Sequence, residues 1–134
     1  MNCSDVIRER RSIRKYKEQV TIPQEDFEKM LEAAMMAPSA RNTRPWEFFV
    51  ITNRDTMARL QDAHPYTSML TTASAAIVVC GRPDLQEGKC GPYWPQDCGA
   101  AIENLLLQAK TWDTAPAGAA AILPWTGWKK SRKF

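Results

Sequence analysis

Apolar residues recur with a helical period in two long segments of the chain. Between Gln24 and Pro38 they fall at intervals of three and four residues, at Phe27, Met30, Leu31, Ala34 and Met35. From Gln96 to Lys110 the same spacing joins Cys98, Ala101, Ile102, Leu105, Leu106 and Ala109. This period predicts two amphipathic helices whose apolar faces pack into a core.

Polar residues and prolines indicate where the helices begin and end. Thr21 and Gln24 have the spacing of a capping box, which predicts the start of the first long helix, and Pro38 ends it. Ser4 predicts the N-cap of a short helix over residues 4–11. Asn53 predicts the cap of another, whose buried side would hold Met57, Leu60 and Ala58.

Two short apolar runs predict β-strands. Trp46–Thr52 is aromatic and β-branched and follows Pro45. Ala75–Cys80 is a continuous apolar run ended by Gly81, which is typical of a strand buried on both faces. Residues 81–95 are expected to form a long loop. Helices alternate with strands, so we expect one domain of mixed α and β structure.

The composition is that of a single folded domain. The chain has 134 residues, of which 44% are hydrophobic and 25% charged, and its net charge is +3. With no long apolar stretch and no secretory signal, we expect a cytoplasmic protein that binds neither membrane nor nucleic acid. No C-x-x-C pair is present and His64 has no second ligand near it, so reduced thiols are expected rather than a metal site: Cys3, Cys80, Cys90 and Cys98.

Two groups of residues could bind a ligand. One places guanidinium groups beside a hydroxyl at the end of a helix, which can bind a phosphate: Arg10, Arg11, Ser12 and Arg14. The other joins a buried helix to a strand with small side chains that let the backbone approach a ligand: Pro38, Ser39, Ala40, Arg41 and Asn42. Taken alone, each is more simply explained as a solvated basic helix end, or as a helix stop and turn.

Taken together and in this order, the two groups resemble the nitroreductase family. The resemblance rests on Arg10 to Tyr16, Leu31 to Asn42 and Arg44 to Phe48. A further segment, Trp94 to Leu107, looks like the family's central helix. The resemblance covers residues 4–110 and implies an α+β fold, with a nitroreductase-like mixed sheet flanked by helices.

The resemblance also implies an FMN site divided between the two subunits of a homodimer. It assigns the FMN phosphate and ribityl chain to Arg10, Arg11, Ser12 and Arg14. It assigns the border of the flavin ring, commonly supplied by the other subunit, to Pro38, Ser39, Ala40 and Asn42. Gln96 and Asp97 would begin the helix that supports the interface.

The implied activity is hydride transfer from NAD(P)H through FMN to a nitroaromatic, quinone or similar small-molecule acceptor. The cofactor carries this reaction, while the protein supplies binding, orientation and electrostatics. No triad or acid/base pair is therefore required, and no residue is assigned a catalytic role.

After Lys110 the sequence departs from the family pattern. We expect an incomplete FMN-binding domain over residues 1–110, and an atypical tail over residues 111–134 that lacks the family's strand and packs as a makeshift helix or stays disordered. One hypothesis is that this tail is an out-of-frame translation after loss of one base near the Lys110 codon. Trp112 followed by Asp113 requires a glycine codon in the overlapping frame, where the family has glycine.

Two other functions remain open at this point. A truncated or frameshifted member of the family would fold in part, bind flavin poorly and be non-catalytic. A basic binding module would contact nucleic acid through residues 10–17 and 129–133, but it lacks interleaved aromatic residues and any recognised nucleic-acid motif.

Overall fold

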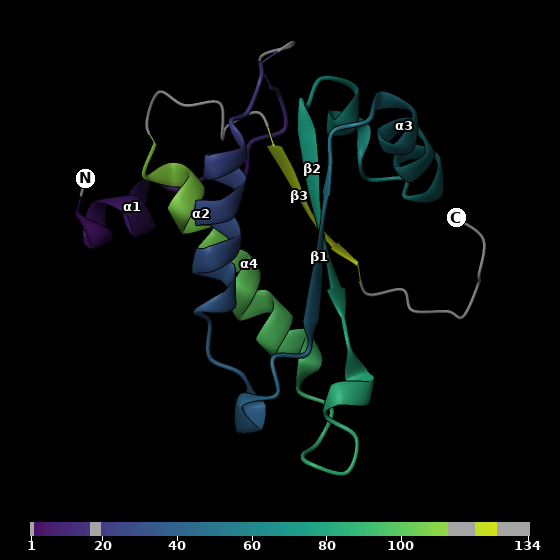
Figure 1. Cartoon of the computed structure of the whole chain (residues 1–134). Helices are drawn as coiled ribbons and strands as arrows, with labels where there is room; N and C mark the ends of the chain where they lie inside the picture. The colour runs from purple at the N-terminus through teal and green to yellow at the C-terminus, as the bar shows by residue number, and fades with distance from the viewer. Residues whose placement is uncertain (1, 17–19, 113–119, 126–134) are drawn as a thin grey trace.

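The described part of the chain is built on a sheet in the order β1-β2-β3 (Figure 1). The computed structural model describes residues 2–16, 20–112 and 120–125, with side chains up to residue 112. Strand β1 (Trp46–Ile51) pairs antiparallel with β2 (Ala75–Gly81), and β2 pairs parallel with β3 (Ala120–Trp125). Because one strand pair is antiparallel and the other is parallel, the sheet is mixed, as expected.

Helices cover both faces of this sheet. Helices α2 (Gln24–Met35) and α4 (Trp94–Lys110) lie side by side on one face, and α3 (Arg54–Ala63) lies on the other (Figure 1). Helix α4 connects β2 to β3, because parallel neighbours need a crossover. The short helix α1 (Cys3–Glu9) packs against α4. The expected α+β class, with helices flanking a small sheet, is confirmed.

Successive side chains of β2 point to opposite faces of the sheet, and this divides the core into two clusters. Ile77 and Val79 face α2 and α4, where they meet fully buried Met30 and Leu105. The intervening residues of β2 face α3, whose predicted apolar residues Met57 and Leu60 are buried there. Burial on both faces explains why β2 reads as a continuous apolar run. Ala58, which we expected on the buried side of α3, is exposed because it lies on the outer face of the helix.

The helix starts differ from two of the predictions. Helix α1 is capped by Asn2, whose Oδ1 accepts from Asp5 N at 3.1 Å, rather than by Ser4. The capping box of α2 does not form, because Gln24 Nε2 donates to Glu28 Oε1 at 2.7 Å instead. Asn53 caps α3 as predicted, with its Oδ1 accepting from Thr56 N at 2.9 Å.

The tail contains a strand, contrary to our expectation. Strand β3 pairs with β2 from Ala75 opposite Ala120 to Cys80 opposite Trp125. Residues 120–125 begin with alanine and include Ile122 and Leu123, which suit a strand beside the apolar β2. The other tail residues beyond Trp112 lie outside the described part of the chain.

Of the helices in the described residues, none combines the length and hydropathy needed to cross a bilayer.

Candidate functional site

The connection between α2 and β1 contains a strained backbone. Arg41, Asn42 and Arg44 have positive φ angles of 55°, 54° and 47°. Each such non-glycine residue costs roughly 1–3 kcal/mol, so the conformation persists only where neighbouring groups hold it. We call residues 39–44 the strained loop; it includes a short 3-10 turn, η1 (Ala40–Asn42).

Side chains within the strained loop hold part of this conformation. Ser39 Oγ accepts a hydrogen bond from Arg44 N at 2.9 Å, and Thr43 Oγ1 donates to Ala40 O at 2.8 Å. Asn42 Oδ1 accepts from Arg44 Nε at 3.3 Å. The amide of Asn42 is therefore turned toward its own loop.

Two buried polar side chains from outside the loop complete the support. Asp97, in the first turn of α4, is 8% exposed, and its Oδ2 accepts from Ala40 N at 3.1 Å. The same oxygen accepts from Gln86 Nε2 at 2.8 Å. Gln86 is 2% exposed and also donates to Thr43 Oγ1 at 3.1 Å. The loop is thus tied both to α4 and to the segment that follows β2.

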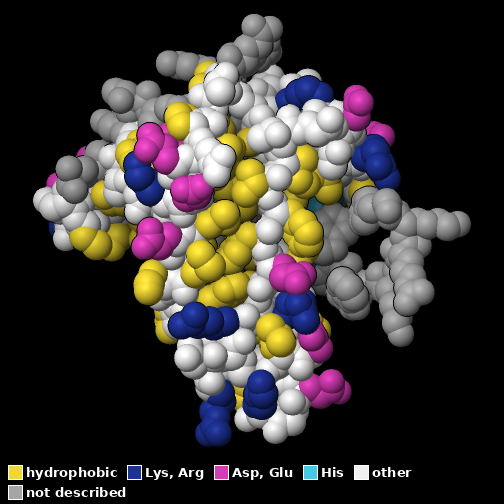
Figure 2. All heavy atoms as spheres, in the orientation of Figure 1, with side chains coloured by type: hydrophobic (Ala, Val, Ile, Leu, Met, Phe, Trp, Pro, Cys, Tyr) yellow, Lys and Arg dark blue, Asp and Glu magenta, His cyan; other side chains and the backbone are white. Residues whose placement is uncertain are grey.

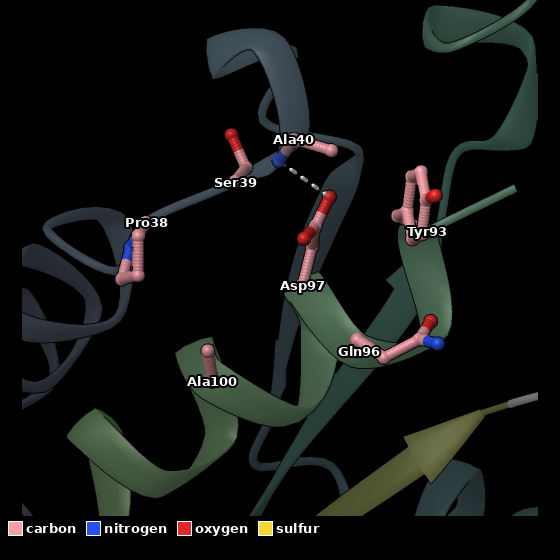
Figure 3. Close-up of a pocket in the computed structure, with 7 residues that line it drawn as sticks. All are labelled: Pro38, Ser39, Ala40, Tyr93, Gln96, Asp97 and Ala100. Atoms are coloured by element: carbon pink, nitrogen blue, oxygen red, sulfur yellow. Dashed lines mark hydrogen bonds between the residues drawn. The ribbon is translucent and has the colours of Figure 1, made fainter. Parts of the chain in front are cut away.

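A cavity of about 360 Å³ lies between the strained loop and the start of α4 (Figure 3). Its walls combine small apolar groups, polar groups and one aromatic ring, from Pro38, Ser39, Ala40, Tyr93, Gln96, Asp97 and Ala100. Three of the four predicted flavin-bordering residues therefore line one cavity. The fourth, Asn42, is not among the lining residues.

The basic segment, Arg10 to Arg14, does not line this cavity, and its first residue contacts α4. Arg10 Nε is 2.9 Å from Glu103 Oε1, although the atom makes no hydrogen bond to any described group, so the contact is an ion pair without hydrogen-bond geometry. Arg11 Nη1 donates to Arg8 O at 2.6 Å and to Arg10 O at 2.8 Å, at the end of α1. Ser12 and Arg14 are exposed.

Helix α4 relates the two predicted groups to each other. Gln96, Ala100 and Glu103 are spaced by four and three residues, so they lie on one face of the helix. Glu103 is one turn beyond the cavity wall, a rise of roughly 4.5 Å. Arg10 and the cavity therefore meet the same face of α4, yet within a single chain the basic segment does not line the cavity.

The thiols near this site are held in their neutral form. Burial raises the pKa of the Cys98 thiol to about 11, and the charge of Asp97 adds to this effect. Burial also raises the pKa of Cys80. Protonated thiols are poor nucleophiles, so these cysteines are packing residues. Within the described residues, no three His, Cys, Asp or Glu side chains gather as a metal site would require.

Sequence reasoning missed three residues of the site. Thr43 directly follows the predicted loop residues but was given no role, and Gln86 carries no motif. Both matter through contacts that Gln86 makes across 43 and 11 positions of the chain. Tyr93 precedes the helix start at Trp94 and was placed in a loop. Asp97 was placed at the start of α4, but its bond to Ala40 depends on tertiary structure.

Comparison with known proteins bears on this geometry. The model of the Nitroreductase family matches residues 7–65, which include the basic segment and the strained loop. A protein of Archaeoglobus fulgidus, provisionally named NADH dehydrogenase/NAD(P)H nitroreductase, is 48% identical over 110 residues, 81% of this chain and 61% of the relative. A protein of the same name from Methanothermobacter thermautotrophicus is 40% identical over 127 residues, 95% of this chain and 61% of the relative.

The chain belongs to the nitroreductase family. It spans about three fifths of the length of these curated relatives. The second alignment includes residues beyond Lys110, so it continues into the segment that we expected to depart from the family pattern.

Solved structures agree with this assignment. A provisionally named NADH dehydrogenase/NAD(P)H nitroreductase from Parabacteroides distasonis superposes with a TM-score of 0.75 at 38% identity, over 83% of this chain and 64% of that chain. A provisionally named nitroreductase from Desulfovibrio desulfuricans, solved in complex with FMN, gives a TM-score of 0.68 at 30% identity, over 83% and 63%.

Proposed function

We propose that this chain is an FMN-dependent oxidoreductase that uses NAD(P)H to reduce a nitroaromatic, a quinone or a similar acceptor. The observation that carries the proposal is the strained loop, whose Ser39 and Ala40 line a cavity together with the start of α4. Backbone strain of this kind clusters at ligand sites. The FMN complex of the Desulfovibrio relative supports the choice of ligand.

The residues around the cavity fit a flavin ring. Pro38, Ala40 and Ala100 contribute small apolar groups to the lining, and Tyr93, a residue that is 51% exposed, contributes an aromatic ring. Ser39 Oγ already accepts a hydrogen bond from the backbone, so its hydrogen remains available to a heterocycle oxygen or nitrogen. When bound, FMN supplies the hydride chemistry, and these groups bind and orient it.

The basic segment fits the phosphate end of the same cofactor. Arg14 and Ser12 are exposed, and the ion pair of Arg10 with Glu103 involves Nε, so its two terminal nitrogens can make a bidentate contact. One terminal nitrogen of Arg11 already donates hydrogen bonds to backbone carbonyls at the end of α1. We therefore assign the phosphate first to Arg10, Ser12 and Arg14, and give Arg11 a supporting role.

We further propose that two chains form the complete site as a cytoplasmic homodimer. In one chain the basic segment does not line the cavity, so a partner is needed if both groups are to hold one cofactor. Figure 2 shows hydrophobic side chains gathered between α2 and β1. Met35, Met36 and Phe49, on and beside these elements, are 47%, 71% and 51% exposed, and exposed apolar groups of this size often mark interfaces.

The alternative is a non-catalytic product whose residues 111–134 were read out of frame and whose flavin binding is impaired. The sequence of the tail, rather than a feature of the cavity, favours it. The two proposals differ in whether the chain retains flavin.

Activity can be tested on the full chain loaded with FMN and freed of excess cofactor. Anaerobic NADH or NADPH should bleach the flavin absorbance band, and a nitroaromatic or quinone should restore it. A band that neither nucleotide bleaches would reject the oxidoreductase proposal for this chain. Sedimentation velocity of the same sample should give the mass of a dimer.

A further inference from the structure

We propose that Asp97 and Gln86 act together as a clamp that sets the conformation of the strained loop. Asp97 belongs to α4, and Gln86 follows the 3-10 turn η3 (Pro83–Leu85). Neither was assigned a role in ligand binding by the motifs. Both are positioning residues, and their effect on cofactor binding rests on the function proposed above.

A single carboxylate oxygen is the centre of the clamp. Asp97 Oδ2 accepts from Ala40 N at 3.1 Å and from Gln86 Nε2 at 2.8 Å. Figure 3 shows the Asp97 carboxylate pointing from α4 toward the backbone of the loop. Since the Ala40 N–H already donates to Asp97, this amide fixes the loop and does not donate to a ligand.

Gln86 extends the clamp to the other half of the loop. Its Nε2 reaches Thr43 Oγ1 at 3.1 Å, and Thr43 Oγ1 donates in turn to Ala40 O at 2.8 Å. The loop is therefore held at Ala40 and at Thr43. Arg41 and Asn42, both in the left-handed region, lie between these two points.

The burial of Gln86 indicates that its amide is needed for these hydrogen bonds. Its Nε2 faces two oxygens, which fixes the orientation of the amide, and its Oε1 is buried without a partner among the described residues. A buried acceptor without a donor is unfavourable. Packing alone would favour an apolar side chain here, so the two hydrogen bonds of Nε2 are what the amide contributes.

Two variants of Asp97 separate the clamp from a general effect on stability. Asp97→Asn keeps an oxygen that can accept both bonds, whereas Asp97→Ala removes it. Amide hydrogen exchange of the full chain without FMN measures how well the loop protects the Ala40 amide, with the amides of β2 as the internal reference. Fluorescence titration with FMN reads the consequence for binding.

In Asp97→Ala we expect exchange at Ala40 and the dissociation constant for FMN each to rise about tenfold or more, as loss of a buried charged acceptor implies. Exchange in β2 should be unchanged, and Asp97→Asn should stay within about threefold of the parent. Equal exchange at Ala40 in the parent and in Asp97→Ala would overturn the clamp, as would equal effects of the two variants.

Gln86→Met covers the case in which Asp97→Ala does not fold. It removes the bridge to Thr43 while keeping the buried volume, and it should raise exchange at Ala40 and Thr43; unchanged exchange at both would overturn the clamp. The clamp and the proposed function fail separately. A parent chain that binds no FMN rejects the function, while the exchange rates still decide the clamp.

Discussion

Arg10 lies with its Nε 2.9 Å from Glu103 Oε1, so the end of α1 is held against the middle of α4. Lys110 Nζ adds a second pair with Glu9 Oε2 at 3.3 Å between the same two helices. The side chains of Arg10 and Glu103 are 29% and 49% exposed, and pairs of this kind contribute at most about 1 kcal/mol to stability. The consequence of the Arg10 contact is therefore position: it keeps the guanidinium beside the face of α4 that also lines the cavity.

The position of Arg10 predicts that it contributes more to FMN affinity than Arg8 does. Arg10→Ala should weaken FMN binding by roughly tenfold to a hundredfold, because it removes a charge-assisted contact to the phosphate. Arg8→Ala, which deletes an equal charge from the exposed side of α1, is the matched control and should change affinity little. Isothermal titration with FMN measures both. Equal losses in the two variants would show that only general positive charge is involved.

A pair of glycine substitutions tests the packing under the site. A Cβ on Gly81 would lie 2.5 Å from Trp94 Cζ3, so Gly81→Ala should destabilise the chain by about 1–3 kcal/mol through overpacking. Gly99 is in the interior of α4 with nothing within 4 Å of its added Cβ. Gly99→Ala should therefore stabilise by about 0.5–1 kcal/mol. Urea denaturation gives both values, and a stabilising Gly81→Ala would show that Trp94 does not pack on β2.

The buried thiol predicts a pH profile for chemical modification. Because its pKa is raised to about 11, Cys98 should be almost entirely protonated at pH 8 and should react slowly with iodoacetamide. Its rate should rise as the pH approaches 11, whereas exposed Cys3 should react readily at pH 8. Mass spectrometry of peptides after timed alkylation separates the two sites. Rapid modification of Cys98 at pH 8 in the folded chain would contradict its buried, neutral state.

The frame of residues 111–134 can be read from the DNA. If a base was lost near the Lys110 codon, the overlapping frame should be a longer continuous open frame. The glycine across Trp112 and Asp113 and the glutamate across Trp128 and Lys129 are required by the codons in either case and do not test the hypothesis. Sequencing through this codon from the source genome is the measurement. An overlapping frame interrupted by stop codons would dismiss the hypothesis.

Periodic elements of the fold were predictable from the sequence, and their contacts were not. The apolar sets of α2 and α4 and the run in β2 identify their own secondary structure, because burial of one face imposes a period. The false capping box at Thr21 shows the limit of local motifs, since Gln24 bonds along its own helix instead. Strand β3 escaped prediction because its pairing with β2 is decided by the sheet rather than by residues 120–125 alone.

The residues of the site likewise fall into those that the sequence predicts and those that depend on tertiary contacts. Pro38, Ser39 and Ala40 were found because the motif is continuous in sequence, and all three line the cavity. Their flavin contacts, and those of Asn42, stay predictions. Gln86 could not be found, because nothing in its own segment indicates that it reaches Thr43 and Asp97.

Flavin retention tests the central proposal most directly. The full chain would be purified with excess FMN, passed through gel filtration, and its absorbance spectrum compared with its protein concentration. We predict a yellow protein that keeps the flavin band at about one FMN per chain, as a symmetric homodimer with two shared sites requires. A folded, colourless chain that retains no flavin would contradict the proposal.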